Sequence, residues 1–352
     1  MDDRFTPAER VMRALNGAPL DKPPFTSYEC FVQPCTDERI LRERGMCIVY
    51  RTRSYTLETP DVKVTARHYR DERGARLIRT EYETPVGTLH TTQEQSELTT
   101  WAHSYMFKTP DDYKPLQFIL DNTVVRENLG GVQKLMDDLG GDFIVRDGLP
   151  LEPLQQFISG AYMDPENFSY EWYDNRDMLL SLYRSACRIN EQCLAIVAKS
   201  PAKIVNYGGN VVPQIIGREI FQQYYMPHYE MACSVLHASG KLVGCHFDAN
   251  NAPIMDLIAK TPLDYIEAYD PGISPGLADA VAAFQDKAIW INWPSPWHLN
   301  PLAQIESDTV SLLSQAKGFK KLLVGITEDV PPDRWRKVYA SIMNGIDTYC
   351  AG

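Results

Sequence analysis

A histidine and two carboxylates stand where two apolar segments of the chain end. His246 and Asp248 are separated by one residue at the end of the apolar run 241–246, and an extended segment sends both side chains to the same side. Glu328 follows a second apolar run, 320–326. One imidazole and two carboxylates form a ligand set compatible with Zn²⁺ or another divalent ion that keeps open coordination positions. The alternative is that Asp248 caps a following helix and that His246 is a core histidine.

Two indoles and an imidazole lie in one proline-stiffened loop, residues 292–298. Trp293, Trp297 and His298 all belong to it. Aromatic walls suit a flat, apolar substrate or cofactor, so Trp293 and Trp297 are candidate substrate-binding residues. The alternative is that Trp297 only covers the rim of the fold.

Further polar side chains follow other apolar runs. Tyr207 and Asn210 flank two glycines, whose amides can approach a ligand closely, although double glycines are often only turns. We expect Tyr207 and Asn210 to act in catalysis by orienting the substrate, with protonation of a leaving group as the alternative role of Tyr207. Tyr269 ends another run and is a third candidate for substrate binding.

Nucleophilic catalysis has little support in the sequence. No Gly-x-Ser-x-Gly elbow occurs, and no cysteine lies near a convincing His/Asn pair. Cys245 adjoins His246, but strand alternation points it towards the helices, as a packing residue.

Short β-rich runs alternate with helical segments along the chain. Periodic apolar positions predict helices over 176–199 and 218–238, with Pro227 interrupting the second. Alternating β and α elements imply a parallel sheet, and eight of each fit a (β/α)8 barrel, whose active site is built from residues just after the strands. A doubly wound open sheet is the alternative, disfavoured because no Gly-x-Gly-x-x-Gly follows a strand. The eight candidate strands are 23–28, 46–51, 142–146, 203–207, 241–246, 263–269, 288–292 and 320–326.

Residues 60–108 differ from this pattern. They alternate polar and apolar positions, with Gly74 and Gly87 as turn residues, which predicts an inserted antiparallel hairpin or meander. We therefore expect one barrel domain over 1–352 that carries this β-rich insertion. The insertion is expected to serve as a lid or as the surface of a homodimer.

Composition excludes several classes of function. The 352 residues include 35 Lys and Arg against 46 Asp and Glu, a net charge of −11, which argues against nucleic acid as a partner. No apolar run approaches the roughly 20 residues of a membrane span, and the N-terminus is charged, so a cytoplasmic protein without membrane contact is expected. The 8 cysteines are scattered without a Cys-x-x-Cys pair, as suits reduced thiols.

Three segments carry a family resemblance over nearly the whole chain: 6–25, beginning TPAERVMRAL, 217–271, which contains VGCHFDANNAP, and 321–335, KLLVGITEDVPPDRW. They resemble the uroporphyrinogen decarboxylase superfamily, specifically its corrinoid-dependent methyltransferase branch. The resemblance implies a (β/α)8 barrel. The decarboxylase itself fits less well, because its Met-Arg-Gln-Ala-Gly-Arg segment is absent.

The resemblance also implies a metal site and a partner. In the methylcobamide:coenzyme M methyltransferases a His-x-Cys-Gly-Asn and a Gly-Cys-x-x-Pro-Pro motif bind zinc through the histidine and both cysteines. This sequence keeps His246 but has Asp248 and Glu328 at the cysteine positions, so the implied zinc has harder ligands that favour an oxygen substrate atom. The implied reaction removes a methyl group from a methoxyarene or another O-methyl donor and passes it to the Co(I) of cobalamin on a small corrinoid protein.

Two other functions stay open. The first keeps the fold and reverses the direction, from the methylated corrinoid to tetrahydrofolate or a thiol, although a thiol acceptor would favour cysteine ligands. The second is a catalytically silent barrel that serves as a binding subunit.

Overall fold

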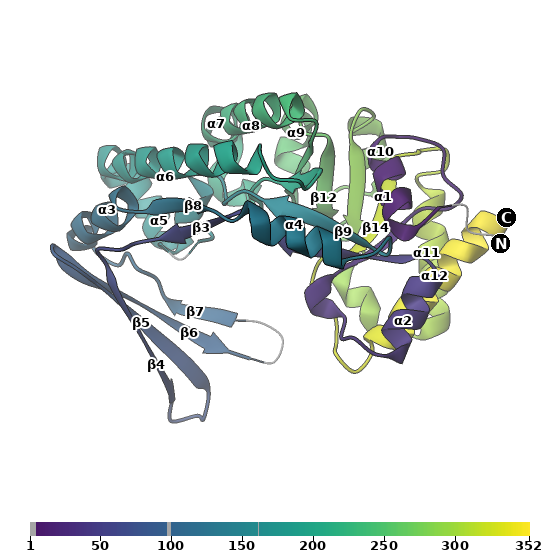
Figure 1. The fold of residues 1–352 in the computed structure, drawn as a ribbon, viewed down its shortest axis with the longest axis horizontal. Helices are drawn as coiled ribbons and strands as arrows, with labels where there is room; N and C mark the ends of the chain where they lie inside the picture. Colours follow the sequence, from purple (N-terminus) through teal and green to yellow (C-terminus); the bar gives the residue numbers. More distant parts are fainter. Residues whose placement is uncertain (1–4, 97–99, 161) are drawn as a thin grey trace. The chain divides into compact units, whose positions relative to one another are not determined.

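Eight parallel strands close into a barrel in the first of two structural units (Figure 1). The computed structural model describes residues 5–96, 100–160 and 162–352. Unit 1 comprises the described residues up to Arg53 together with Gly130–Gly148 and Ser200–Gly352; unit 2 comprises the described residues of Ser54–Leu129 and Leu149–Lys199. The expectation of one domain over 1–352 stays a prediction.

Each barrel strand pairs in parallel with the next in the chain, and the last closes on the first. Most of the strands are short, largely apolar runs, and those over 288–292 and 322–326 are buried at every position, as parallel strands covered by helices are. They fall on the eight predicted runs, and the predicted (β/α)8 barrel is confirmed. Their bounds are β1 (Phe25–Tyr28), β2 (Met46–Thr52), β9 (Phe143–Gly148), β10 (Ile204–Asn206), β11 (Leu242–His246), β12 (Tyr265–Tyr269), β13 (Ala288–Asn292) and β14 (Leu322–Ile326).

Local sequence accounts for the start of one helix of unit 1 and for the break between two others. Thr6 and Glu9 form a reciprocal capping box at the start of α1. The predicted helix 218–238 is two helices, α7 and α8, that meet at Tyr225, because Pro227 has no N–H to continue the first. The bounds are α1 (Pro7–Leu15), α2 (Thr36–Glu43), α4 (Leu129–Asp138), α7 (Pro213–Tyr224), α8 (Met226–Ala238), α9 (Met255–Lys260), α10 (Leu277–Ala283), α11 (Leu302–Ser314) and α12 (Trp335–Ala351).

Side chains fill the barrel. Tyr265 and Trp290 pack at 5.9 Å between ring centroids, and Cys47 and Leu323 belong to the same buried cluster. The interior is therefore a packed core, and chemistry is expected at the carboxyl ends of the strands. Cys245 faces outward as predicted, with its Sγ 3.6 Å from the hydroxyl of Tyr229 on α8.

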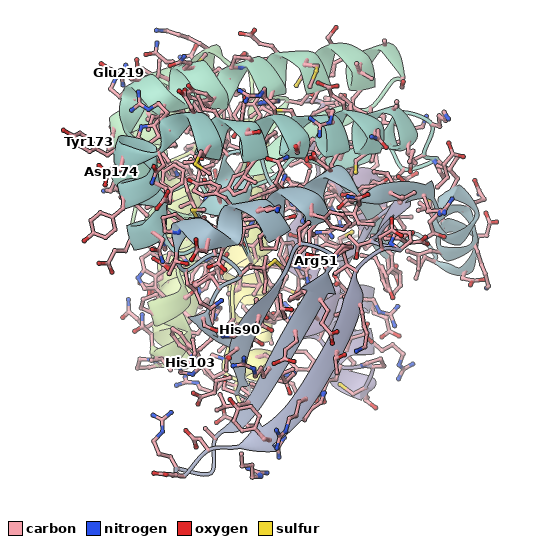
Figure 2. All side chains as sticks on the ribbon, turned by 90° about the vertical axis from the view of Figure 1, so that its left-hand side faces the viewer. Arg51, His90, His103, Tyr173, Asp174 and Glu219 are labelled. Carbon is pink, nitrogen blue, oxygen red and sulfur yellow. The ribbon has the colours of Figure 1, made fainter. Side chains whose placement is uncertain are left out.

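Unit 2 holds two antiparallel sheets and three helices. The sheet β4-β5-β6-β7 confirms the predicted meander, with β7 as a strand that the sequence did not indicate. Figure 2 labels His90 and His103 on this sheet, where the Nε2 of His103 lies 2.7 Å from a carboxylate oxygen of Glu94. The bounds are β3 (Tyr55–Glu58), β4 (Lys63–Arg70), β5 (Arg76–Thr84), β6 (Gly87–Gln95), β7 (Thr100–Ser104), α3 (Tyr113–Asp121), β8 (Val124–Glu127), α5 (Pro165–Asp174) and α6 (Arg176–Val197).

None of the helices in the described part of the chain combines the length and the apolar character that crossing a bilayer requires.

Candidate metal centre

His246, Asp248 and Glu328 lie together at the carboxyl ends of β11 and β14. One potential ligand atom from each of the three lies within 4.8 Å of the other two. The Nε2 of His246 is 3.1 Å from the Oε1 of Glu328 and 3.7 Å from the Oδ2 of Asp248. Closure of the barrel therefore brings together the residues that the sequence singled out.

The surroundings of Asp248 fit a cation. Its Oδ1 is buried, and no described residue gives it a hydrogen bond. A buried carboxylate oxygen without a partner is costly, and a bound divalent ion would offset that cost. The alternative in which Asp248 caps a helix is wrong, because α9 begins at Met255 with Ile254 at its N-cap position.

A third carboxylate, that of Glu267, contacts the opposite side of the His246 ring. The Nδ1 of His246 lies 2.9 Å from the Oε2 of Glu267, a residue of β12 with no exposed surface. The hydroxyl of Tyr28 and the Nη1 of Arg146 both donate to the other oxygen, Oε1. Sequence reasoning missed all three residues. Two of them had a signal, a charged side chain inside a run that otherwise reads as a buried strand, 263–269 for Glu267 and 142–146 for Arg146, whereas Tyr28 had none.

Electrostatics favour the charged forms of Glu267 and His246. Burial by itself raises the pKa of Glu267, but the charge of Arg146 and the hydrogen bond from His246 lower that pKa to about 2. Burial by itself lowers the pKa of His246, but Tyr28 and the hydrogen bonds to Asp248, Glu267 and Glu328 hold it well above its ordinary value. The pocket around Nε2 is thus built for positive charge, which a proton or a metal ion can supply.

A glycine lets the loop after β10 pass against His246. Gly209 has φ +135°, and a Cβ added there would lie 2.5 Å from the Cβ of His246. Its neighbour Asn210 is exposed, has φ 56° and donates its backbone N–H to the His246 carbonyl at 3.0 Å.

Gly209→Ala should therefore displace His246. We expect this variant to lose about 1–3 kcal/mol of unfolding free energy and to bind zinc more weakly, because it adds backbone strain and pushes on the imidazole. Gly240→Ala is the control, since Gly240 also has a positive φ, +68°, but nothing within 4 Å of the added Cβ. Urea unfolding and zinc titration of both variants check this; equal zinc affinity in the two would contradict it.

The other predicted site residues have varied surroundings. Trp293 and Trp297 lie together, edge to face, with ring centroids 5.2 Å apart, and no described residue accepts from the buried Nε1 of Trp293. Tyr207 packs edge-on against Tyr229 of α8, with centroids 5.8 Å apart. Tyr269 donates its hydroxyl to the Pro275 carbonyl at 2.6 Å.

Two buried histidines should make the fold less stable in acid. Burial lowers the pKa of His298 to about 4, with Arg334 adding to the effect, and burial lowers that of His228 to about 4. The unfolded chain binds these protons below about pH 6.5, whereas the folded chain does so only near pH 4. Stability is thus full above about pH 6.5 and falls by about 3 kcal/mol per histidine down to about pH 4. Urea unfolding at both pH values should show about half of that loss for His298→Phe; an unchanged loss would contradict it.

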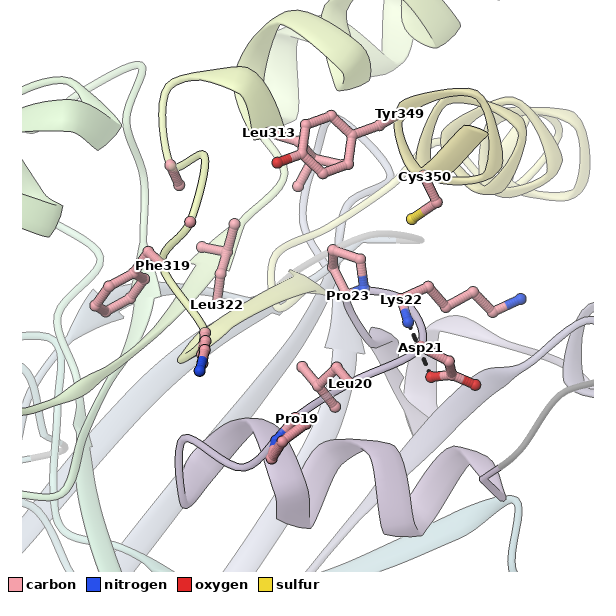
Figure 3. A pocket seen from close by; sticks show the side chains of 13 residues that line it. Pro19, Leu20, Asp21, Lys22, Pro23, Leu313, Phe319, Leu322, Tyr349 and Cys350 are labelled. Atoms are coloured by element: carbon pink, nitrogen blue, oxygen red, sulfur yellow. Dashed lines mark hydrogen bonds between the residues drawn. The ribbon is translucent and has the colours of Figure 1, made fainter. Parts of the chain in front are cut away.

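A separate hollow of about 380 Å³ lies at the opposite end of the barrel (Figure 3). Leu20 and Pro23 line it from the segment before β1, Phe319 from the segment before β14, and Tyr349 and Cys350 from α12. These are the amino ends of the strands, where barrels of this kind carry stabilising rather than catalytic residues. The candidate metal centre is at the other end.

The whole chain was compared with known proteins. No family model and no curated protein matches the chain. A methyltransferase from Methanosarcina mazei has a similar structure, with a TM-score of 0.61 and 14% identity over 98% of this chain and 99% of that one. A B12-independent methionine synthase from Shewanella sp. W3-18-1 gives a TM-score of 0.44 and 9% identity, over 90% of this chain and 84% of that one. The first likeness shows a shared fold, and the second is too low to add to it.

Proposed function

We propose that this chain is a zinc-dependent methyltransferase that removes a methyl group from an O-methyl donor, with an aryl methyl ether as the first candidate, and passes it to Co(I) of a corrinoid protein. One observation carries the proposal: His246, Asp248 and Glu328 meet at the carboxyl end of the barrel, within 4.8 Å of one another. The similarity in fold to a methyltransferase supports the reaction class by analogy.

The ligand chemistry favours an oxygen donor. His246, Asp248 and Glu328 would hold the ion, and when bound it would supply a Lewis acid that stabilises negative charge on a leaving oxygen. Phenols have a pKa of about 10, so a phenolate is a tolerable leaving group once its charge is stabilised. A thiol acceptor would instead favour the cysteine ligands that this chain lacks at these positions.

The remaining residues would bind and orient the donor. Trp297, which is partly exposed, would offer its ring as an apolar wall for an aromatic group, with the fully buried Trp293 packed edge to face against it. Asn210, which is exposed, is proposed as an orienting residue. For Tyr207 and Tyr269, which are buried, the same role would require their rings to leave Tyr229 and Phe284. The corrinoid protein is proposed as the partner on the sequence resemblance.

An anaerobic assay tests the proposal. Reduced cobalamin, the protein and a panel of methoxyarenes are mixed, Co(I) and methyl-Co(III) are followed by absorption, and free phenol is assayed. We expect methyl-Co(III) and phenol to form together and a chelator to stop both.

Other outcomes would contradict the proposal. Demethylation of methylcobalamin by tetrahydrofolate or a thiol, with no reaction of any methoxyarene, would show the reverse direction. Absence of both reactions and of zinc binding, with tight association to another protein, would favour a silent binding barrel.

A further inference from the structure

The buried carboxylate Glu267 divides its two oxygens between different partners. Oε2 faces the Nδ1 of His246 at 2.9 Å, whereas Oε1 accepts from Tyr28 and Arg146. Arg146 alone would neutralise the charge of Glu267 through Oε1. That ion pair does not require Oε2 to contact the imidazole of His246. The contact with His246 therefore calls for a separate explanation.

The backbone directly after Glu267 is strained and irregular. Ala268 has φ 58°, in the left-handed region that residues with a Cβ rarely adopt. The pairing of β12 with β13 shifts register between Glu267 and Tyr269, as at a β-bulge. Bulges re-aim side chains and gather next to active sites. Here Glu267 faces the barrel interior, while Tyr269 packs against Phe284, with ring centroids 6.1 Å apart.

Tyr28 is held as firmly as Glu267. Its ring lies 4.1 Å from the Arg51 guanidinium and 5.1 Å from that of Arg146, and it stacks on Phe31 with centroids 5.9 Å apart. Arg51 is itself paired with Glu29 at 3.1 Å. The Tyr28 hydroxyl consequently has one orientation, towards Glu267 and the Nδ1 of His246, which is 3.4 Å away.

We propose that Glu267, Tyr28 and Arg146 are positioning residues of the metal centre. Glu267 accepts the Nδ1–H of His246, which leaves the lone pair of Nε2 on the side of Asp248 and Glu328, and Tyr28 with Arg146 fixes the carboxylate that does this. This inference rests on the metal site of the proposed function. It adds a requirement beyond the presence of the three proposed ligands: the imidazole of His246 must be held in one tautomer and one orientation.

Zinc affinity of folded variants tests the inference without any methyl transfer. We expect Glu267→Gln to bind zinc about 10–100-fold more weakly than the wild type, measured by competition with a chelator, because an amide is a poorer acceptor than a carboxylate. Tyr28→Phe removes one hydroxyl and should show a smaller loss in the same direction. The matched control is His237→Gln, which breaks another histidine–carboxylate contact of unit 1, 2.8 Å to Asp264, and should bind zinc like the wild type.

The absorption spectrum of bound Co²⁺ distinguishes a positioning role from a merely structural one, which would leave the spectrum unchanged. The visible absorption of Co²⁺ bound in place of zinc reports ligand geometry, so its bands should shift in Glu267→Gln and Tyr28→Phe and stay unchanged in His237→Gln. If Glu267→Gln does not fold, the zinc affinity and the cobalt bands of Tyr28→Phe test the positioning role. Wild-type zinc affinity and cobalt bands in the folded variants would overturn the positioning role.

The two proposals can fail separately. A wild-type protein that binds no zinc would overturn both. A wild-type protein that binds zinc, loses affinity with Glu267→Gln and transfers no methyl group would overturn the proposed function and support the positioning role.

Discussion

Glu328→Gln should lower both zinc affinity and methyl transfer by more than the roughly 10–100-fold that is typical of losing an outer-sphere partner. The substitution keeps the shape of the side chain and removes the charge that lies 3.1 Å from the Nε2 of His246. Because the Glu328 side chain is 40% exposed, little change in unfolding free energy is expected. Zinc content after dialysis and the anaerobic methyl-transfer assay measure the two effects.

Asp329→Asn is the matched control for this prediction. It makes the same change of charge one residue further along, at an exposed side chain outside the metal-ligand group. It should keep wild-type zinc content and rate. Full zinc occupancy and an unchanged rate in Glu328→Gln would remove that residue from the ligand set.

Arg146→Met should destabilise the barrel by about 3–5 kcal/mol, measured by urea unfolding. The substitution leaves the carboxylate of Glu267, which has no exposed surface, without its cationic partner inside the barrel. Removing one member of a buried ion pair is costly because the charge that remains is desolvated and has lost its main countercharge. Arg146→Met combined with Glu267→Gln should recover part of the loss, since both charges are then gone.

A surface pair provides the comparison. Arg218 donates to both oxygens of Asp256, at 2.6 and 2.8 Å, but both side chains are about half exposed, so Arg218→Met should change stability little. Equal, small effects of Arg146→Met and Arg218→Met would mean that Glu267 does not carry its charge in the folded protein.

These two predictions address different layers of one site. Glu328 is a proposed metal ligand at the carboxyl end of the barrel. Arg146 lies inside the barrel and acts on the site through its ion pair with Glu267. The pKa of Glu267, about 2, is low only because Arg146 and His246 outweigh the effect of burial. The same interactions that stabilise the barrel interior therefore hold the imidazole of the candidate metal centre.

The amino-acid sequence by itself determined the strands and the residues that follow them. Apolar runs bounded by polar residues are local patterns, and a parallel strand covered on both faces is a largely apolar run. That is why the runs ending near His246 and Glu328 could be recognised, and why barrel closure alone was enough to bring these residues together. Pro227 likewise marks the break between α7 and α8 through its own missing N–H.

Only the tertiary structure decided how the site is held. Tyr28, Arg146 and Glu267 come from three strands and are 118 to 239 residues apart, so their meeting depends on the order and register of the barrel strands. Alternation from Glu267 would turn Tyr269 into the barrel, but the bulge at Ala268 points it at Phe284 instead. A bulge depends on the pairing of two strands and leaves little trace in either strand alone. Residue periodicity is a local property and strand register is not, which is why the proposed ligands could be predicted and the residues that position them could not.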